Sequence, residues 1–228
     1  MAKNEKKDKK KYLNYKKTLL RNFFFRRESI EDEGKSTTEA RAVVEGLSYI
    51  QMKLPTEKIT KEFEQSLKEK ISHNILRAKI REATIEDLET VRYIHNRAWL
   101  TSNTPFSPIT LEGIRDVFKI SSTKIFIARV YGQDAGFLIT DLEGENDEIG
   151  VIAGLGILPR FQRRYLGTIL GMHSWEYFKK QKIKELKCEV YVDNMASYKL
   201  IKGLGFEEYD RITYGTEDFE IPNEKKEN

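Results

Sequence analysis

The chain has 228 residues, of which 39% are hydrophobic and 33% are charged, and its formal net charge is +4. With 12 Phe and 11 Tyr it can form a sizeable core, which excludes a wholly disordered protein. It contains no run of about 18 apolar residues, and no apolar segment with a cleavage site follows its basic start, so we expect no transmembrane helix, no secretory signal and a cytoplasmic protein.

The positive charge is concentrated at the start of the chain. Residues 1–27 carry 11 Lys or Arg against Glu5 and Asp8, so the remainder is mildly acidic. We expect a basic tail over residues 1–35, in which residues 1–27 make weak contact with nucleic acid or an anionic surface. Apolar residues from Tyr12 to Phe23 allow three readings: an amphipathic surface helix, a helix that packs on the protein itself, or a disordered tail.

Residues 36–75 predict a helical extension. Ser36 and Glu39 have the spacing of a capping box, and apolar residues follow at helical intervals as far as Ile50. Pro55 ends this pattern. A second helix is then indicated by Ile59, Phe63, Leu67 and Ile71.

Residues 76–218 alternate between strand and helix patterns, and residues 219–228 form a charged tail. The run from Ile149 to Leu158 is apolar throughout, which predicts a strand buried on both faces. In residues 186–192 the alternation places Cys188 inward and Glu189 outward. Strands are indicated at 78–83, 124–130, 135–140, 149–158, 186–192 and 206–214, helices at 84–98, 110–121, 166–180 and 195–204, and a loop at 101–108.

Chemistry is concentrated where the strand at 149–158 passes into the following helix. The N-terminus of a helix presents free N–H groups and a positive dipole end, which suits a phosphate. Arg160, Arg163 and Arg164 add positive charge, and Gly167 would let the backbone approach a ligand. The alternative reading is an ordinary surface helix with a basic first turn.

Two motifs lie in this order along the chain. Residues 162–167 read Gln-Arg-Arg-Tyr-Leu-Gly, close to the pattern Arg/Gln-x-x-Gly-x-Gly/Ala. One helix and one strand later, Asn194 is followed by a small residue, Ser197, and by Gly205-Phe206. Together the two motifs resemble those of the GNAT superfamily of acetyl-CoA-dependent N-acyltransferases, and the resemblance covers residues 77–214.

The resemblance implies an α/β (α+β) fold, with a mixed, mostly antiparallel twisted sheet of six to seven strands flanked by helices. It implies an N-acetyltransferase that moves an acetyl group from acetyl-CoA to a primary amine by direct attack in a ternary complex. Acetyl-CoA would be the co-substrate, no metal would be required, and the partner would be an amine acceptor, either a small molecule or a protein amino group. Residues 156–159 resemble the bulged strand end of the family.

The resemblance also implies where CoA binds. The turn amides would hold the pyrophosphate, and the backbone of Ile157 would pair with the pantetheine arm in a splay between the strands at 149–158 and 186–192. An amide near Ile157 or Leu158 would polarise the thioester carbonyl. The first signature glycine is replaced by Tyr165, which ordinary helical angles would accommodate. The expected CoA-binding residues are Ile157, Leu158, Gln162, Arg163, Arg164, Tyr165, Leu166, Gly167, Thr168, Asn194 and Ser197.

Catalytic residues are less clearly indicated. Ile201 stands where many members have the tyrosine that protonates the thiolate, and Tyr198, one helical turn earlier, could replace it. Val151 stands where some members have a catalytic Glu. The base would then be Glu148 or Asp141 acting through water, or a chain of water molecules alone. The acceptor pocket would be lined by His95, Trp99 and Phe106, although His95 could equally be a packed helix residue.

These departures from the family pattern leave an alternative open. The chain could be a catalytically silent CoA-binding or regulatory module, with a basic tail that binds nucleic acid or a membrane.

Overall fold

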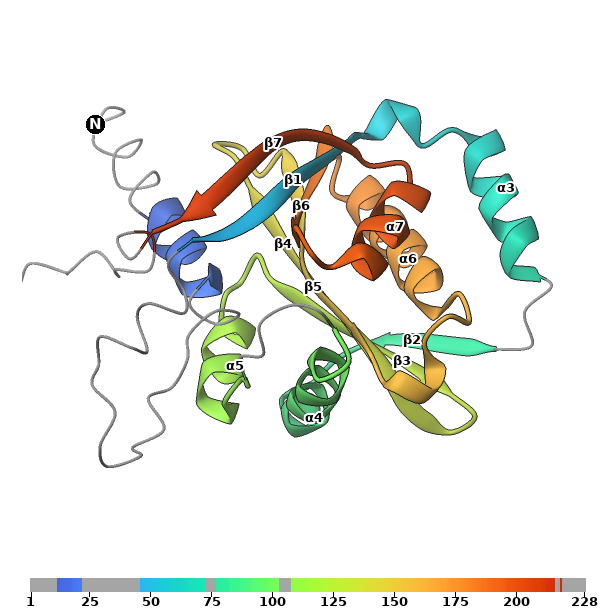
Figure 1. The fold of residues 1–228 in the computed structure, drawn as a ribbon, viewed down its shortest axis with the longest axis horizontal. Coiled ribbons are helices and arrows are strands. Elements are labelled where there is room, and N and C mark those ends of the chain that lie inside the picture. Colours follow the sequence, from blue (N-terminus) through green and yellow to red (C-terminus); the bar gives the residue numbers. More distant parts are fainter. Residues whose placement is uncertain (1–11, 22–45, 73–76, 103–107, 216–217, 219–228) are drawn as a thin grey trace, which may run out of the picture.

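A computed structural model describes residues 12–21, 46–72, 77–102, 108–215 and 218. Its centre is a seven-stranded sheet in the order β2-β3-β4-β5-β6-β1-β7 (Figure 1). Every neighbouring pair is antiparallel except β5 and β6, which are parallel. The predicted mixed sheet is therefore confirmed. The strands are β1 (Leu47–Pro55), β2 (Ala78–Glu82), β3 (Lys124–Val130), β4 (Gln133–Glu143), β5 (Ile149–Ile157), β6 (Glu185–Tyr191) and β7 (Glu207–Tyr214).

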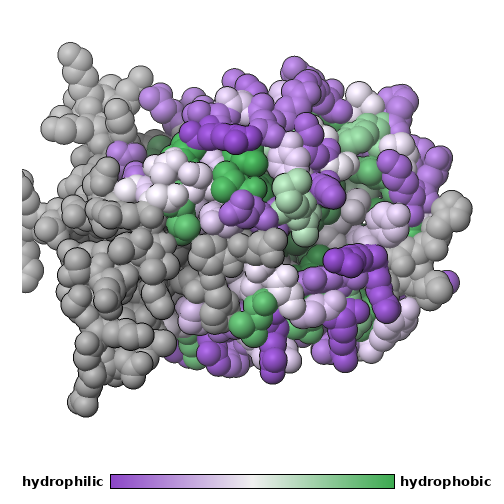
Figure 2. Space-filling view, in the orientation of Figure 1, coloured by the Kyte–Doolittle hydropathy of each residue, from purple (hydrophilic) through white to green (hydrophobic). Residues whose placement is uncertain are grey.

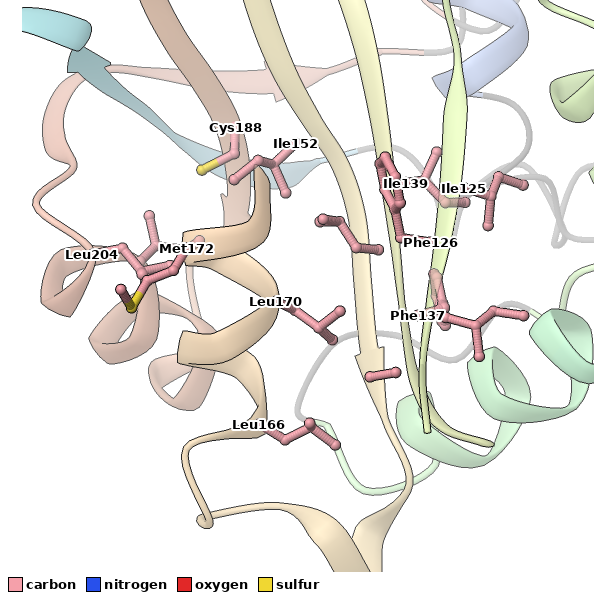
Figure 3. Close-up of a cluster of buried hydrophobic side chains, with 14 of the residues drawn as sticks. Ile125, Phe126, Phe137, Ile139, Ile152, Leu166, Leu170, Met172, Cys188 and Leu204 are labelled. Carbon is pink, nitrogen blue, oxygen red and sulfur yellow. The ribbon is translucent and has the colours of Figure 1, made fainter. Parts of the chain in front are cut away.

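Helices pack on both faces of the sheet. On one face α6 packs against β4 and β5, and α3 and α7 pack against α6, whereas α4 contacts β4 and β5 from the other side. Figure 3 shows this two-sided core, with Leu170 and Met172 of α6 on one side and Ile125 and Ile139 on the other. The helices are α3 (Lys61–Ser72), α4 (Leu88–Trp99), α5 (Leu111–Phe118), α6 (Leu166–Lys180) and α7 (Met195–Gly203), with short 3-10 turns at Thr56–Lys58, Ile85–Asp87 and Pro159–Phe161.

Capping residues mark the start of several helices. Thr84 and Asp87 form a capping box ahead of α4. The Thr110 side chain accepts a hydrogen bond from the Gly113 amide at the start of α5, and the Asn194 side chain accepts one from Ser197 at the start of α7. These caps satisfy amides that a helix cannot satisfy by itself, so sequence-local chemistry fixes these boundaries.

The predicted helix that reaches Ile50 is wrong at its described end, because Leu47–Pro55 is strand β1. Ile50, Met52 and Leu54 alternate into the core, and β1 pairs with β6 on one side and β7 on the other. Two partner strands outweigh a local helical spacing. The sheet therefore extends upstream of residue 76. Residues 36–45 of that prediction lie outside the described residues.

The N-terminal helix (residues 12–21) packs on the body next to the ends of β1 and β7 (Figure 1). Lys16 and Leu20 are buried, whereas Tyr12 and Tyr15 are exposed. Of the readings stated for this segment, packing on the protein itself is the one that the structure supports, since a buried ion pair between Lys16 and Asp141 holds it to β4. The other residues of the predicted tails, 1–11, 22–35 and 219–228, lie outside the described residues.

The described surface is mainly polar. Figure 2 shows polar side chains over most of the coloured face, with apolar groups in separate patches. Every helix in the described ranges is too short or too polar to cross a membrane. Those ranges also contain no group of three or more His, Cys, Asp or Glu side chains arranged to hold a metal ion.

Candidate functional site

The turn between β5 and α6 forms a cradle of backbone amides. Arg163 and Tyr165 both have left-handed backbone angles, with φ of 56° and 60°. The expectation of ordinary helical angles at Tyr165 is therefore wrong, because this residue precedes the helix as its N-cap. Left-handed residues in a turn direct successive N–H groups to one side, which makes an anion-binding concavity. Among the described residues, the amides of Arg163 and of residues 165–168 have no backbone acceptor in the turn and cap hydrogen bonds.

Gln162 braces this turn with its side chain. Its Nε2 donates hydrogen bonds to the carbonyl oxygen of Ile157, at 2.9 Å, and to Oγ1 of Thr101, at 3.2 Å. The side chain therefore points back to the end of β5 and not into the cradle. Its contribution to anion binding is to hold the loop in shape.

Gly167 has a packing role. A Cβ at this position would lie 2.8 Å from Cδ2 of Leu200 and 3.3 Å from Cδ1 of Ile157. The absence of a side chain therefore lets α6 pack closely against α7 and β5. A larger residue here would have to displace the end of the Leu200 side chain, so it would affect the helix packing together with the turn.

Basic and aromatic side chains lie next to the turn. Arg160 and Arg164 line a pocket of about 310 Å³, together with Tyr131 and Phe161. The Arg160 guanidinium carbon lies 4.7 Å from the centre of the Phe161 ring. This side of the turn therefore combines positive charge with planar groups.

Strands β5 and β6 separate, as the resemblance implies. Their parallel pairing ends at Ile152 and Cys188, although β5 continues to Ile157. The pairing of β4 with β5 skips Ala153, which is a β-bulge. The expected bulge at residues 156–159 is therefore placed too late, since the strand is bent where the gap opens.

The gap presents unpaired backbone on β5. The Leu158 amide donates to the carbonyl oxygen of Ala135 at 2.9 Å, so it is not available to polarise a substrate. In an antiparallel ladder the direction of hydrogen bonding alternates, so the amides of Leu155 and Ile157 face away from β4 and into the gap. Of the two residues, Leu155 lines the groove described next.

A groove of about 410 Å³ runs from this gap across the sheet. Its inner part is lined by β5, β6 and α7, including Leu155, Asn194 and Ser197. Its other part, here called the acceptor end, is lined by Tyr49, Gln51, Glu143, Glu189 and Tyr214, with Lys17, Leu20 and Arg21 of the N-terminal helix across from them. Ile149 and Val151 of β5 also line the groove and are half-buried, so β5 is not buried on both faces as predicted.

Glu189 is the ionisable residue that the sequence analysis missed. It follows Cys188 in β6, so it lies level with the Ala153 bulge at the point where the strands part. Its Oε1 accepts a hydrogen bond from the Tyr214 hydroxyl at 2.5 Å. The carboxylate is open to solvent along the groove but enclosed by its walls, and this loss of surrounding water raises its pKa above the usual range, with the Tyr214 hydrogen bond opposing the shift. The only available signal was its place on the outward face of β6.

The acids and the tyrosine expected to be catalytic lie elsewhere. The Tyr198 hydroxyl donates to Glu208 of β7, which raises the pKa of the phenol, and Tyr198 does not line the groove. Glu148 accepts a hydrogen bond from the Asn146 amide and closes its own turn. Asp141 is buried beside Lys16. None of these three side chains lines the groove, because each is held by a partner outside it: Tyr198 of α7 by Glu208, Glu148 by its own turn, and Asp141 by Lys16.

The residues predicted to line the acceptor pocket lie in different places. Trp99 lines the groove. His95 is fully buried behind it, and the two rings stack with centroids 4.0 Å apart. Burial lowers the pKa of His95 to about 4, so the imidazole is neutral at pH 7. His95 is therefore a support for Trp99, not a substrate contact, and Phe106 lies outside the described residues.

A protein-family model described as "Acetyltransferase (GNAT) family" matches residues 88–206, more than half of the chain. The chain belongs to the GNAT family. The match spans α4, the bulged strand, the amide turn and the Asn194 cap, whereas β1, β7 and the N-terminal helix, which also line the groove, lie outside it. A search of curated protein sequences gave no significant match.

Solved GNAT structures share the fold at low sequence identity. An aminoglycoside acetyltransferase, meta-AAC0020 from an uncultured soil metagenomic sample in complex with sisomicin, is 16% identical with a TM-score of 0.52, over 61% of this chain and 95% of that one. The ribosomal-protein-S18-alanine N-acetyltransferase from Escherichia coli is 22% identical with a TM-score of 0.50, over 59% and 80%. Aminoglycoside N-acetyltransferase AAC(6')-Iy in complex with CoA is 21% identical with a TM-score of 0.50, over 61% and 93%.

Proposed function

We propose that the protein is an acetyl-CoA-dependent N-acetyltransferase that acts on a primary amine, with Glu189 as the general base. The observation that carries this proposal is the position of Glu189 beside the Ala153 bulge, at the mouth of the gap between β5 and β6. Acyl transfer to an amine requires both a slot for the thioester and a proton acceptor next to it, and these two features meet there.

The residues from the amide turn to the gap between β5 and β6 suit successive parts of acetyl-CoA. The free amides at Arg163 and Tyr165–Thr168 suit the pyrophosphate, and Arg160 and Arg164 add positive charge beside it. The exposed edge of β5 at Ile157 suits the amide-containing pantetheine arm, which would pair with it as a strand does. Asn194 and Ser197 line the groove from α7. CoA bound in the similar AAC(6')-Iy structure supports this use of the fold.

The chemistry follows from the same arrangement. Glu189 takes a proton from the acceptor ammonium, and the free amine attacks the thioester carbonyl. The Leu155 amide, which faces the gap and lines the groove, donates to the developing oxyanion. A C–N bond forms and the C–S bond breaks. The second proton leaves the nitrogen and ends on the departing thiolate, so no protein acid such as Tyr198 is required.

Thiol release from acetyl-CoA, measured with a panel of primary amines, tests this proposal. We expect Glu189→Gln to lower kcat by about 10²–10⁴-fold, the usual contribution of a general base. Glu148→Gln is the matched control and should leave turnover unchanged, because this carboxylate serves its own turn. Full activity in Glu189→Gln would reject Glu189 as the base. Acetyl-CoA binding without turnover of any amine would favour a silent CoA-binding module.

A further inference from the structure

The acceptor end of the groove already holds cations that belong to this chain. The Arg21 guanidinium carbon lies 4.4 Å from the centre of the Tyr214 ring, and the Tyr214 hydroxyl donates to Glu189. The guanidinium also donates a hydrogen bond to the backbone carbonyl of Asp218, at 2.9 Å, and lies 3.8 Å from the carboxylate of the same residue. One turn earlier in the same helix, Lys17 Nζ lies 2.7 Å from a carboxylate oxygen of Glu143.

The wall beneath these side chains is suited to a positive group. Tyr49 packs against Tyr191 and Tyr214 with ring centroids 5.6 Å apart in both pairs, which makes a continuous aromatic surface. Aromatic faces attract ammonium and guanidinium groups, and the attraction grows when water is excluded. Glu143 and Glu189 add two carboxylates at the edges of this surface.

Without the N-terminal helix this end of the groove is short of positive charge. Among the described residues that line the groove, the cationic side chains are Lys17, Arg21 and Lys187. Lys187 is paired with Glu185 at 3.2 Å. The body of the protein therefore offers carboxylates and aromatic rings, and the N-terminal helix supplies the cations that cover them.

We propose that the acceptor end is a subsite for the ammonium group of a cationic acceptor, and that Arg21 occupies it as an internal pseudosubstrate. That the bound cation is a substrate rests on the proposed function, whereas the binding of a cation at this end of the groove does not. Arg21 can fill the subsite without reacting, because a guanidinium does not lose its proton in proteins. A tethered group competes at an effective concentration in the millimolar range or higher, so weakly charged amines would be excluded and strongly cationic ones admitted.

The helix does not depend on Arg21 for its position. Lys16 pairs with Asp141 in the interior, and Leu20 is buried against the core. Substitution of Arg21 should therefore empty the subsite and leave the helix docked. The role of Arg21 in the groove can therefore be tested without undocking the helix.

The experiment measures binding of n-propylguanidinium, a cation that cannot be acetylated at neutral pH, by calorimetry with the full-length protein. Arg21→Met keeps much of the side-chain volume and removes the charge, and Arg21→Lys keeps the charge. Lys119→Met, at the exposed residue that follows α5, is the matched control for the loss of one positive charge. Acetyl-CoA affinity and the thermal midpoint are measured for each variant.

We expect the Kd of n-propylguanidinium to fall at least tenfold in Arg21→Met and to stay near the wild-type value in Arg21→Lys and Lys119→Met. Adding Glu189→Gln or Tyr214→Leu to Arg21→Met should abolish the gain. Equal affinity in wild type and Arg21→Met, or a gain that survives both second substitutions, would overturn the subsite. Tighter binding of n-propylguanidinium in Arg21→Met without turnover of any amine would reject the acetyltransferase activity and leave the subsite in place. Turnover of an amine without this tighter binding would reject the subsite and leave the acetyltransferase activity in place.

Discussion

Lys16 and Asp141 form a buried ion pair that joins the N-terminal helix to strand β4. Nζ of Lys16 lies 2.8 Å from Oδ2 of Asp141, and the two side chains are 2% and 0% exposed. Oδ1 of Asp141 also accepts hydrogen bonds from the hydroxyls of Ser122 and Thr123, at 2.8 and 3.1 Å. Each charge has lost its water and depends on the other, so the pair makes the helix part of the folded domain.

Loss of one member of this pair should be costly. Lys16→Met leaves the Asp141 carboxylate buried without its counter-ion, and we expect the free energy of unfolding to fall by about 3–5 kcal/mol in urea titrations at pH 7. Lys17→Met is the control, since the Lys17–Glu143 pair is half-exposed and should contribute under about 1 kcal/mol. The double variant Lys16→Met/Asp141→Leu should recover much of the loss. Equal stability of Lys16→Met and wild type would show that the helix does not dock through this pair.

Tyr165 holds a strained backbone in the amide cradle. A left-handed angle at a residue with a Cβ costs about 1–2 kcal/mol, and the half-exposed side chain recovers little of it by burial. Tyr165→Gly should therefore raise the free energy of unfolding by about 1 kcal/mol, read as an increase in thermal midpoint, and should retain acetyl-CoA binding. Tyr165→Ala keeps the Cβ and should give no gain. A gain of equal size in the alanine variant would mean that the phenol, not the backbone, is the source of strain.

The pKa of Glu189 predicts the shape of the pH–rate profile. The general base must be ionised, and enclosure in the groove raises its pKa above that of an ordinary Glu. We expect kcat/KM to fall as the pH drops through this raised pKa, so the acidic limb should lie above the usual range near pH 4.5. In Glu189→Gln the limb should disappear along with most of the rate. A limb that persists with the same midpoint in Glu189→Gln would assign it to another group.

His95 should make the protein sensitive to mild acid. Its folded pKa is about 4 because burial disfavours the imidazolium, whereas the unfolded chain titrates near 6.5. Between these values the unfolded state binds more protons, so stability is lost as the pH falls from about 6.5 towards 4, by roughly 3 kcal/mol in total. His95→Phe keeps the stack on Trp99 and should flatten this part of the stability curve. His173, half-buried and also lowered in pKa, would supply the slope that remains.

Local patterns predicted those parts of the site that are encoded by neighbouring residues. The run from Gln162 to Thr168 was assigned to a strand-to-helix turn, and the structure shows a cradle of amides there. The turn depends on backbone sterics and capping within a few residues, so a single sequence contains the information. The gap between β5 and β6 was implied by the family resemblance and not by a local pattern, and the pairing ends at Ile152 and Cys188.

The catalytic candidates depend on contacts that are not local. Tyr198 was chosen by its position in the motif and Glu148 by its place near a strand end, but a side chain's direction depends on what packs around it. Glu208 of β7 draws the Tyr198 hydroxyl away from the groove. Glu189 was seen only as an outward residue of a strand, and nothing near it in the sequence shows that the outward face of β6 becomes the floor of a groove.

The sequence by itself determined the mixed strand and helix order, the helix caps and the phosphate-type turn, because each is set by contacts within one turn or one strand. Only the tertiary structure decided that residues 47–55 are a strand, that the N-terminal helix covers the groove, and that Glu189 meets Tyr214. Strand β1 and the helix require partners about 125 residues or more away, and Glu189 of β6 requires Tyr214 of β7, on the far side of β1. Burial and pairing between distant segments outweigh local preference, and only the folded chain brings those segments together.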